Sequence, residues 1–210
     1  MTAAVLVAAV PLYAPQLLAF LYRSGIGPYQ VWSEVPLDGI RIRAAFQLAN
    51  AKVKRSPLAR ASEPRRVFVT QGGWRWHWLA VSSSGSFAIT RPLGTAIVVN
   101  HTDPAGAIVR NARAVVKGRT LASIIAHETT HGMIRRRFGF YADRIYPTWL
   151  TEGYCDFVAG ESTLSSTDVA RLSAAGTDHP ALVYYHGRRK VTAILASNGG
   201  SVERMFAKAR

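Results

Sequence analysis

Two histidines of this chain, His127 and His131, lie four residues apart, and Glu128 directly follows the first of them. On a helix, this spacing places the two imidazoles one turn apart on the same face, with the carboxylate beside them. Imidazole nitrogens are suitable ligands for zinc, and a catalytic zinc ion has three protein ligands and one open position. The pattern therefore predicts a metal site, and it requires a third ligand from elsewhere in the chain.

Glu152 is the candidate for this third ligand. Residues 132–151 separate it from His131, which is enough for one helix to end, a loop to reverse the chain and a second helix to begin. A carboxylate oxygen completes a set that suits zinc, although the same ligands also bind other divalent metals. Glu128 can then act as the general base that takes a proton from a zinc-activated water. We expect one Zn²⁺ per chain, bound by His127, His131 and Glu152.

The HExxH pentapeptide at residues 127–131, followed by a glutamate in the WxxEG-like phrase at residues 149–153, resembles the gluzincin zinc metallopeptidases of the peptidase MA-like group. The resemblance is specific over residues 119–160, whereas residues 24–118 contain no recognisable peptidase motif. It implies a zincin-like fold, a zinc-dependent hydrolase and a peptide or protein substrate. In gluzincins with an ExxxD arrangement the aspartate supports a ligating histidine, and here this role falls on Asp156. An aspartate on the helix surface is the alternative.

The same resemblance implies a side chain that stabilises the oxyanion formed when water attacks a peptide carbonyl. The segment Tyr184-Tyr185-His186-Gly187 resembles the Y-x-x-G start of a later helix that supplies this group in membrane-associated relatives. We assign the role to Tyr184, with Tyr185 or His186 as alternates. Aromatic packing beneath the site is the competing interpretation.

A catalytically silent protein is the main alternative to a peptidase. In this interpretation, a zinc-stabilised, membrane-proximal binding protein keeps a peptidase scaffold, which would agree with the small size and the lack of a recognisable substrate domain. However, a structural zinc is normally closed by four protein ligands, often thiolates, and has no use for Glu128. The single cysteine, Cys155, is interpreted as a small buried residue of the Glu152 helix.

The charge balance of the 210-residue chain is strongly basic. Its 26 lysines and arginines exceed its 12 acidic residues, giving a net charge of +14, which favours anionic partners. The basic residues are scattered, with short clusters only at residues 135–137 and 188–190, and no nucleic-acid-binding motif accompanies them. We therefore interpret them as solvated surface charge and expect no specific nucleic-acid partner.

The N-terminal segment contains no charged side chain over residues 1–22. This length is sufficient to span a bilayer, so the pattern predicts a single-pass membrane anchor, a transmembrane helix over residues 1–23. The side of the membrane on which the remaining domain, residues 24–210, would lie is left open. A cleaved signal peptide and an arm packed on the domain are the two alternatives.

The remaining elements must position these residues. Helical spacing and capping signals predict helices over residues 38–54, 120–138, 148–159, 167–175, 180–197 (capped by Asp178) and 202–208. Strand-like runs occupy residues 66–70, 74–81, 86–90 and 95–100, and the three alternating tryptophans of the second run predict one packed sheet face. Residues 25–36 and 101–119 are interpreted as connectors. By the gluzincin resemblance, the run at 86–90 or that at 95–100 would be the substrate-binding edge strand.

Strands followed by helices indicate an α+β fold: a small mixed or antiparallel β-sheet subdomain, then a helical subdomain that carries the HExxH helix.

Overall fold

The computed structural model of this chain describes residue 12 and residues 14–91, 96–103, 108–111 and 118–209. Six of its helices start and end close to the residues that the sequence predicts: α2 (Gly39–Lys54), α4 (Leu121–Phe138), α6 (Thr148–Ala159), α7 (Ser166–Ala174), α8 (Leu182–Ser197) and α9 (Val202–Ala207). The described residues also form helices that the sequence did not predict: α3 (Trp74–Ala80), α5 (Ala142–Ile145) and the short 3-10 helices η1 (Pro15–Leu18) and η2 (Val81–Ser83).

The strands form a mixed five-stranded sheet in the order β1-β2-β3-β5-β4 and a separate two-stranded sheet of β6 and β7. The edge pairs β1–β2 and β4–β5 are antiparallel, whereas β2–β3 and β3–β5 are parallel. The strand bounds are β1 (Tyr22–Ile26), β2 (Tyr29–Ser33), β3 (Arg65–Val69), β4 (Ala88–Thr90), β5 (Ile97–Val99), β6 (Ile108–Val109) and β7 (Arg119–Thr120). The predicted α+β class is therefore confirmed, although α2 and α3 lie between strands of the mixed sheet and only α4 to α9 follow it.

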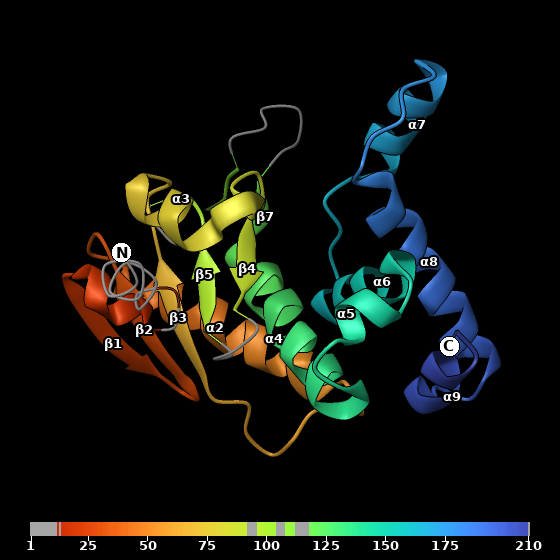
Figure 1. Cartoon of the computed structure of the whole chain (residues 1–210), viewed down its shortest axis with the longest axis horizontal. Helices are drawn as coiled ribbons and strands as arrows, with labels where there is room; N and C mark the ends of the chain where they lie inside the picture. Colours follow the sequence, from red (N-terminus) through yellow and green to blue (C-terminus); the bar gives the residue numbers. More distant parts are fainter. Residues whose placement is uncertain (1–11, 13, 92–95, 104–107, 112–117, 210) are drawn as a thin grey trace, which may run out of the picture.

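Helix α4 lies between the sheet and the helical part of the molecule (Figure 1). One sheet face packs against α2 and α4, through apolar residues such as Val67, Phe46 and Ile125. The opposite sheet face is covered by α3 and η1. The other side of α4 packs on α6, which in turn packs on α8, around buried Tyr154 and Val191. Every long-range contact that fixes α4 therefore also fixes the HExxH pentapeptide.

The predicted strand over residues 74–81 is wrong, because these residues form the helix α3 and the turn of η2. Trp76 is buried against the sheet, with 1% of its surface exposed, whereas Trp74 and Trp78 are 59% and 47% exposed. Residues four apart share one face of a helix, and the residue between them lies on the opposite face. The three tryptophans therefore do not line a common sheet face. The prediction failed because so short an alternation of residues is compatible with a helix as well as with a strand.

Two passages interpreted as connectors contain strands. Residues 25–36 include a hairpin between β1 and β2 that turns at Gly27 and Pro28, where Gly27 has a φ of 55°. Residues 101–119 include β6 and β7. The glycines and prolines of residues 25–36 led to the interpretation of this passage as a connector rather than as the strands β1 and β2. The turn at Gly27 has the positive φ that glycine tolerates. Asp178 does not cap α8, since the residue before this helix is Ala181 and no side chain caps it.

The predicted single-pass membrane anchor over residues 1–23 is corrected by the structure. Of this range, residues 1–11 and 13 lie outside the described part of the chain. Across the residues that are described, no helix combines the length and apolar character needed to cross a membrane. The described end of the segment instead contains η1 and the start of β1.

This N-terminal stretch packs against the domain. Leu18 and Phe20 contact the cluster beneath α3, and the Phe20 ring lies 5.2 Å from that of Phe68 between centroids. Arg75 Nε donates a hydrogen bond of 2.7 Å to the carbonyl oxygen of Leu18. The described part of the segment therefore agrees with the alternative of an arm packed on the domain.

Helices α6 and α8 approach so closely that glycine faces glycine. A Cβ atom added to Gly153 would overlap the backbone of Gly187, and one added to Gly187 would overlap the carbonyl of Trp149. Such a contact leaves no volume for a methyl group. Since α6 carries Glu152 and α8 carries Tyr184, the close approach also sets how far apart these two side chains lie.

We therefore expect Gly187→Ala to destabilise the protein by about 1–3 kcal/mol, because the added methyl group forces α8 away from α6. For a chain of this size the melting temperature should fall by roughly 2–4 °C per kcal/mol, measured by circular dichroism. Gly39→Ala is the control, since a Cβ there meets nothing within 4 Å and the position starts a helix. An unchanged melting temperature for Gly187→Ala would contradict the close packing.

Candidate metal centre

Helix α4 is buried although it carries several polar residues. Thr120 caps its N-terminus by accepting a hydrogen bond from the backbone N–H of Ser123 at 3.3 Å, and Gly139 follows its last residue, both as predicted. Every residue from Leu121 to Ile134 is buried, because the sheet covers one side and α6 the other. Buried polar side chains must find partners, so each of those in the HExxH pentapeptide has to be accounted for.

Three side chains converge at the interface of α4 and α6, as the sequence predicts. The Nε2 atoms of His127 and His131 lie 3.2 Å apart. Oε2 of Glu152 lies 3.2 Å from Nε2 of His127, and its Oε1 lies 3.5 Å from Nε2 of His131. Two nitrogens and one carboxylate therefore point at a common position.

These separations fit a tetrahedral zinc ion. With metal–ligand bonds of about 2.0–2.1 Å, the ligand atoms of a tetrahedral site lie about 3.3–3.4 Å from one another. The three distances between His127, His131 and Glu152 lie on either side of that value. The residues present therefore fit a zinc ion with one coordination position left for a further group.

The second nitrogen of His127 is held by Asp156, as the gluzincin resemblance implies. Nδ1 lies 2.8 Å from Oδ1 of Asp156, which is completely buried. Arg119 forms an ion pair of 3.0 Å with the same oxygen, and the Ser162 hydroxyl donates to Oδ2 at 2.7 Å. Burial favours the neutral form of Asp156, but Arg119 and His127 outweigh it and hold the pKa below its usual value. This carboxylate can therefore stay ionised and keep Nε2 of His127 directed at the metal position.

Asp143 of α5 performs the same role for His131. Its Oδ1 lies 3.1 Å from Nδ1 of His131, and its Oδ2 accepts from Nε of Arg135 at 2.5 Å. Burial raises the pKa of this carboxyl, but His131 and Arg135 overcome the effect and the pKa lies below its usual value. Both imidazoles thus use Nδ1 for a carboxylate, which leaves both Nε2 atoms for a metal.

Cys155 offers an alternative third ligand. Ligand atoms of His127, His131 and Cys155 all lie within 4.8 Å of one another. However, the Glu152 oxygens lie 3.2 and 3.5 Å from the two Nε2 atoms, and Glu152 borders a cleft whereas Cys155 is fully buried. Burial raises the pKa of the thiol to about 12, against the opposing effect of His131, although a coordinated zinc ion would itself deprotonate a thiol. The set containing Glu152 borders the cleft, as a catalytic zinc with an open position requires, whereas the thiol lies away from it.

The electrostatic environment of the site favours positive charge. Burial disfavours the protonated form of His127, yet Asp156 and Glu152 raise its pKa above the usual value. The pKa of His131 is raised well above the usual value, with Cys155 and Glu152 as the leading causes against burial. The pKa of Glu152 lies far below its usual range, since the two histidines outweigh the effect of burial. A divalent cation would supply the positive charge that this surrounding stabilises.

Glu128 lies beside this position and is held by β4. It is buried, with 7% of its surface exposed, and lines the cleft. The hydroxyl of Thr90 lies 2.7 Å from both Oε2 and the backbone carbonyl oxygen of Glu128. This contact connects the end of β4 to the HExxH helix and fixes the direction of the carboxylate.

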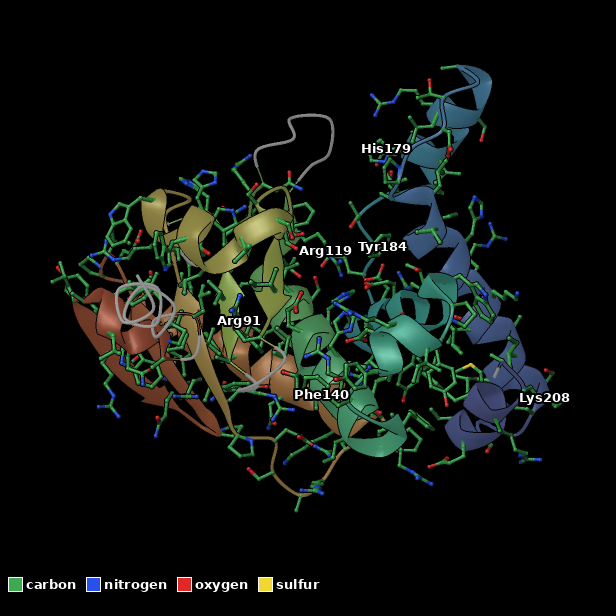
Figure 2. All side chains as sticks on the ribbon, viewed as in Figure 1. Arg91, Arg119, Phe140, His179, Tyr184 and Lys208 are labelled. Atoms are coloured by element: carbon green, nitrogen blue, oxygen red, sulfur yellow. The ribbon has the colours of Figure 1, made fainter. Side chains whose placement is uncertain are left out.

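A cleft of about 780 Å³ opens between β4 and the helical part of the molecule. It contains the three ligand side chains and Glu128, and Tyr184 of α8 lines its opposite wall, across from Arg119 of β7 in Figure 2. Tyr184 is the residue that the sequence favoured for this wall, whereas Tyr185 packs near Leu172 and His186 is exposed. Burial, followed by Glu152, raises the pKa of the Tyr184 hydroxyl above its usual value. This hydroxyl therefore keeps its proton and can donate it in a hydrogen bond.

Sequence reasoning missed Asp143, Thr90 and Arg119. Asp143 follows a loop, so no helical spacing relates it to His131. The only signal in the sequence is that acidic residues are few in this basic chain. Thr90 and Arg119 come from strands whose position beside α4 depends on the tertiary fold. No local pattern in the sequence indicates either contact.

Comparison with protein-family models, curated proteins and solved structures yields no match for this chain.

We expect about one zinc per chain in the wild-type protein and its removal by a strong chelator. Glu152→Ala should lose the metal because a third ligand disappears, whereas Cys155→Ala should retain it. Metal content can be measured by mass spectrometry after dialysis against zinc. Loss of zinc from Cys155→Ala together with its retention in Glu152→Ala would show that the thiol is the ligand instead.

Asp143→Ala should weaken zinc binding by roughly 10–100-fold, because His131 loses the group that orients its ring. Competition with a chromophoric chelator would give the dissociation constant. Asp178→Ala, in an exposed segment before α8, serves as the control for removing one negative charge. Equal affinities for the wild type and Asp143→Ala would contradict the supporting role.

Proposed function

We propose that this protein is a zinc-dependent metallopeptidase with a gluzincin-like catalytic site on a zincin-like core. The observation that carries the proposal is the convergence of His127, His131 and Glu152 beside Glu128, at distances suited to zinc and at the side of a cleft. A zinc ion bound there would lower the pKa of a coordinated water to about 7 and polarise a carbonyl. A purely structural site would have no need of Glu128 or of an open position.

Glu128 is the proposed general base. Its carboxylate would accept a proton from the attacking water and later pass it to the leaving amine. The Thr90 hydroxyl, 2.7 Å from Oε2, would hold the carboxylate in position for this transfer. Placing the base on the residue next to His127 keeps it close to the metal position without occupying it.

Tyr184 is the proposed oxyanion donor. Its hydroxyl stays protonated at neutral pH and faces the cleft that contains the ligands. A phenol in this position can donate a hydrogen bond to the oxygen on which negative charge develops.

Strand β4 is the proposed binding edge for an extended substrate. It is the last strand of the sheet order, and residues 86–91 line the cleft. The backbone N–H of Arg91 donates to the carbonyl oxygen of Ala96, and the carbonyl oxygen of Phe87 accepts from the N–H of Asn100, so these residues of the β4 segment face β5. Successive residues of a strand direct their backbone groups to opposite sides, and those of Ala88 and Thr90 therefore point to the other edge. A peptide can add to such an edge through main-chain hydrogen bonds. Of the two runs considered from the sequence, only that at 86–90 has this position, because β5 is an interior strand.

Glu128→Gln should reduce peptide hydrolysis by about 10²–10⁴-fold while zinc content stays at the wild-type level, because the amide cannot accept the proton. Initial rates on a quenched peptide library and metal analysis on the same preparation would measure both. Unchanged hydrolysis with zinc bound would contradict Glu128 as the general base. No hydrolysis by the zinc-loaded wild type would instead favour the zinc-stabilised binding protein.

Tyr184→Phe should lower kcat by about 10²–10³-fold with little change in KM, because only the hydrogen bond to the developing charge is lost. Tyr185→Phe is the matched control, since the neighbouring ring packs outside the cleft. A larger effect from Tyr185→Phe would transfer the role to the alternate residue.

A further inference from the structure

The cleft is unevenly charged along its length. At the end where β4 finishes, three guanidinium groups line it, from Arg91, Arg135 and Arg144, against two carboxylates, that of Asp143 and that of Glu128, which is hydrogen-bonded to Thr90. Toward the start of β4, the lining includes uncharged polar groups such as Ser86. Arg91 and His179 mark these two ends in Figure 2. One end of the cleft therefore carries an excess of positive charge.

The carboxylate of Asp143 is already paired with positively charged or hydrogen-bonding groups of this chain. Its two oxygens contact His131 and Arg135, at 3.1 and 2.5 Å. Nη1 of Arg135 also reaches the carbonyl oxygen of Thr90 at 3.5 Å, which brings the end of β4 and helix α5 to the same end of the cleft. Arg91 donates to the carbonyl oxygens of Leu12 and Leu79, so its guanidinium group is bound by the backbone of this chain.

Arg144 is the cation of this group that remains available. It is exposed on α5, lines the cleft and forms no ion pair with any carboxylate in the described part of the chain. An exposed guanidinium without a carboxylate partner can form a bidentate contact with a carboxylate of a ligand. The adjacent Asp143 forms no ion pair with Arg144, because the Asp143 side chain is directed at His131 and Arg135.

From this charge distribution, we infer that the cleft selects peptides with an acidic side chain, bound by Arg144 at the end of β4. This inference rests on the proposed peptidase function and gives it a substrate class. The net charge of +14 acts in the same direction, since it raises the local concentration of acidic peptides before they reach the cleft. The local contact and the long-range field can be separated by substitution.

The test uses the full chain loaded with zinc and quenched peptides in pairs that differ only by Glu against Gln at one position. Cleavage of each pair gives a ratio of kcat/KM for every position. Equilibrium binding of the same peptides, fluorescein-labelled, to Glu128→Gln gives a second readout that does not depend on hydrolysis. At low salt we expect the Glu peptide to be favoured about fivefold at one position or a few adjacent ones, and less so at high salt.

Arg144→Glu should abolish or reverse this preference. Lys208→Glu is the matched control, because it changes the net charge by the same amount just after α9, far from the cleft in Figure 2. If the preference came only from the overall field, both variants would reduce it equally, which would overturn the role of Arg144. Arg144→Gln, which removes the charge without adding one, should give an intermediate ratio.

The outcomes also separate this inference from the proposed function. Equal cleavage and equal binding of Glu and Gln peptides would overturn the selectivity and leave the peptidase intact. Preferential binding of Glu peptides without cleavage of any peptide, in a zinc-loaded protein, would overturn the peptidase and keep the acidic binding site. Absence of both cleavage and binding for every peptide, in a zinc-loaded protein, would overturn both.

Discussion

The structure depends on burying two imidazoles inside the molecule without leaving either nitrogen unpartnered. Helix α4 could not lie between the sheet and α6 with bare histidines on its surface, since buried polar groups without partners are costly. His127 and His131 each meet this demand with a carboxylate on Nδ1, from Asp156 and Asp143. The Nε2 atoms are thereby left facing each other and Glu152.

Each supporting carboxylate is in turn balanced by an arginine. Arg119 pairs with Asp156, and Arg135 pairs with Asp143. A buried charge without a partner would be strongly destabilising, so these pairs are a condition for keeping the carboxylates ionised. A third pair fixes α4 from behind, where Arg136 reaches the buried carboxylate of Glu63 at 2.7 Å. The position of the HExxH helix is thus set by charge pairs on several sides.

The sequence was sufficient to predict the local parts of this arrangement. The helix of the HExxH pentapeptide and that of Glu152 follow from capping residues, glycine ends and spacing, and residues on one helix face are related by a fixed period. Asp156 lies one turn beyond Glu152, and the gluzincin resemblance implied its role as the support of a ligating histidine. Asp143, Thr90 and Arg119 could not be found in this way, because loops and strand pairing bring them to α4 from distant segments. The helix of Trp74 to Ala80 was missed for the opposite reason: an alternation of three residues is too short to distinguish period 2 from period 3.6.

A cation site in a chain of net charge +14 is not a contradiction, because the two effects act over different distances. Scattered surface arginines are screened beyond about 8–10 Å at moderate salt, whereas carboxylates within a few ångströms of the metal position act in a poorly screened environment. Glu152, whose oxygens lie 3.2 and 3.5 Å from the two Nε2 atoms, therefore acts directly on the position where a metal would bind, whereas Asp143 and Asp156 are paired with arginines and the surplus cations act outside. A divalent ion meets negative charge at the site, while an anionic ligand approaching from solvent meets positive charge first. Concentrating several of only twelve acidic residues around α4 would thus allow one small domain both to hold the proposed metal and to attract acidic molecules to it.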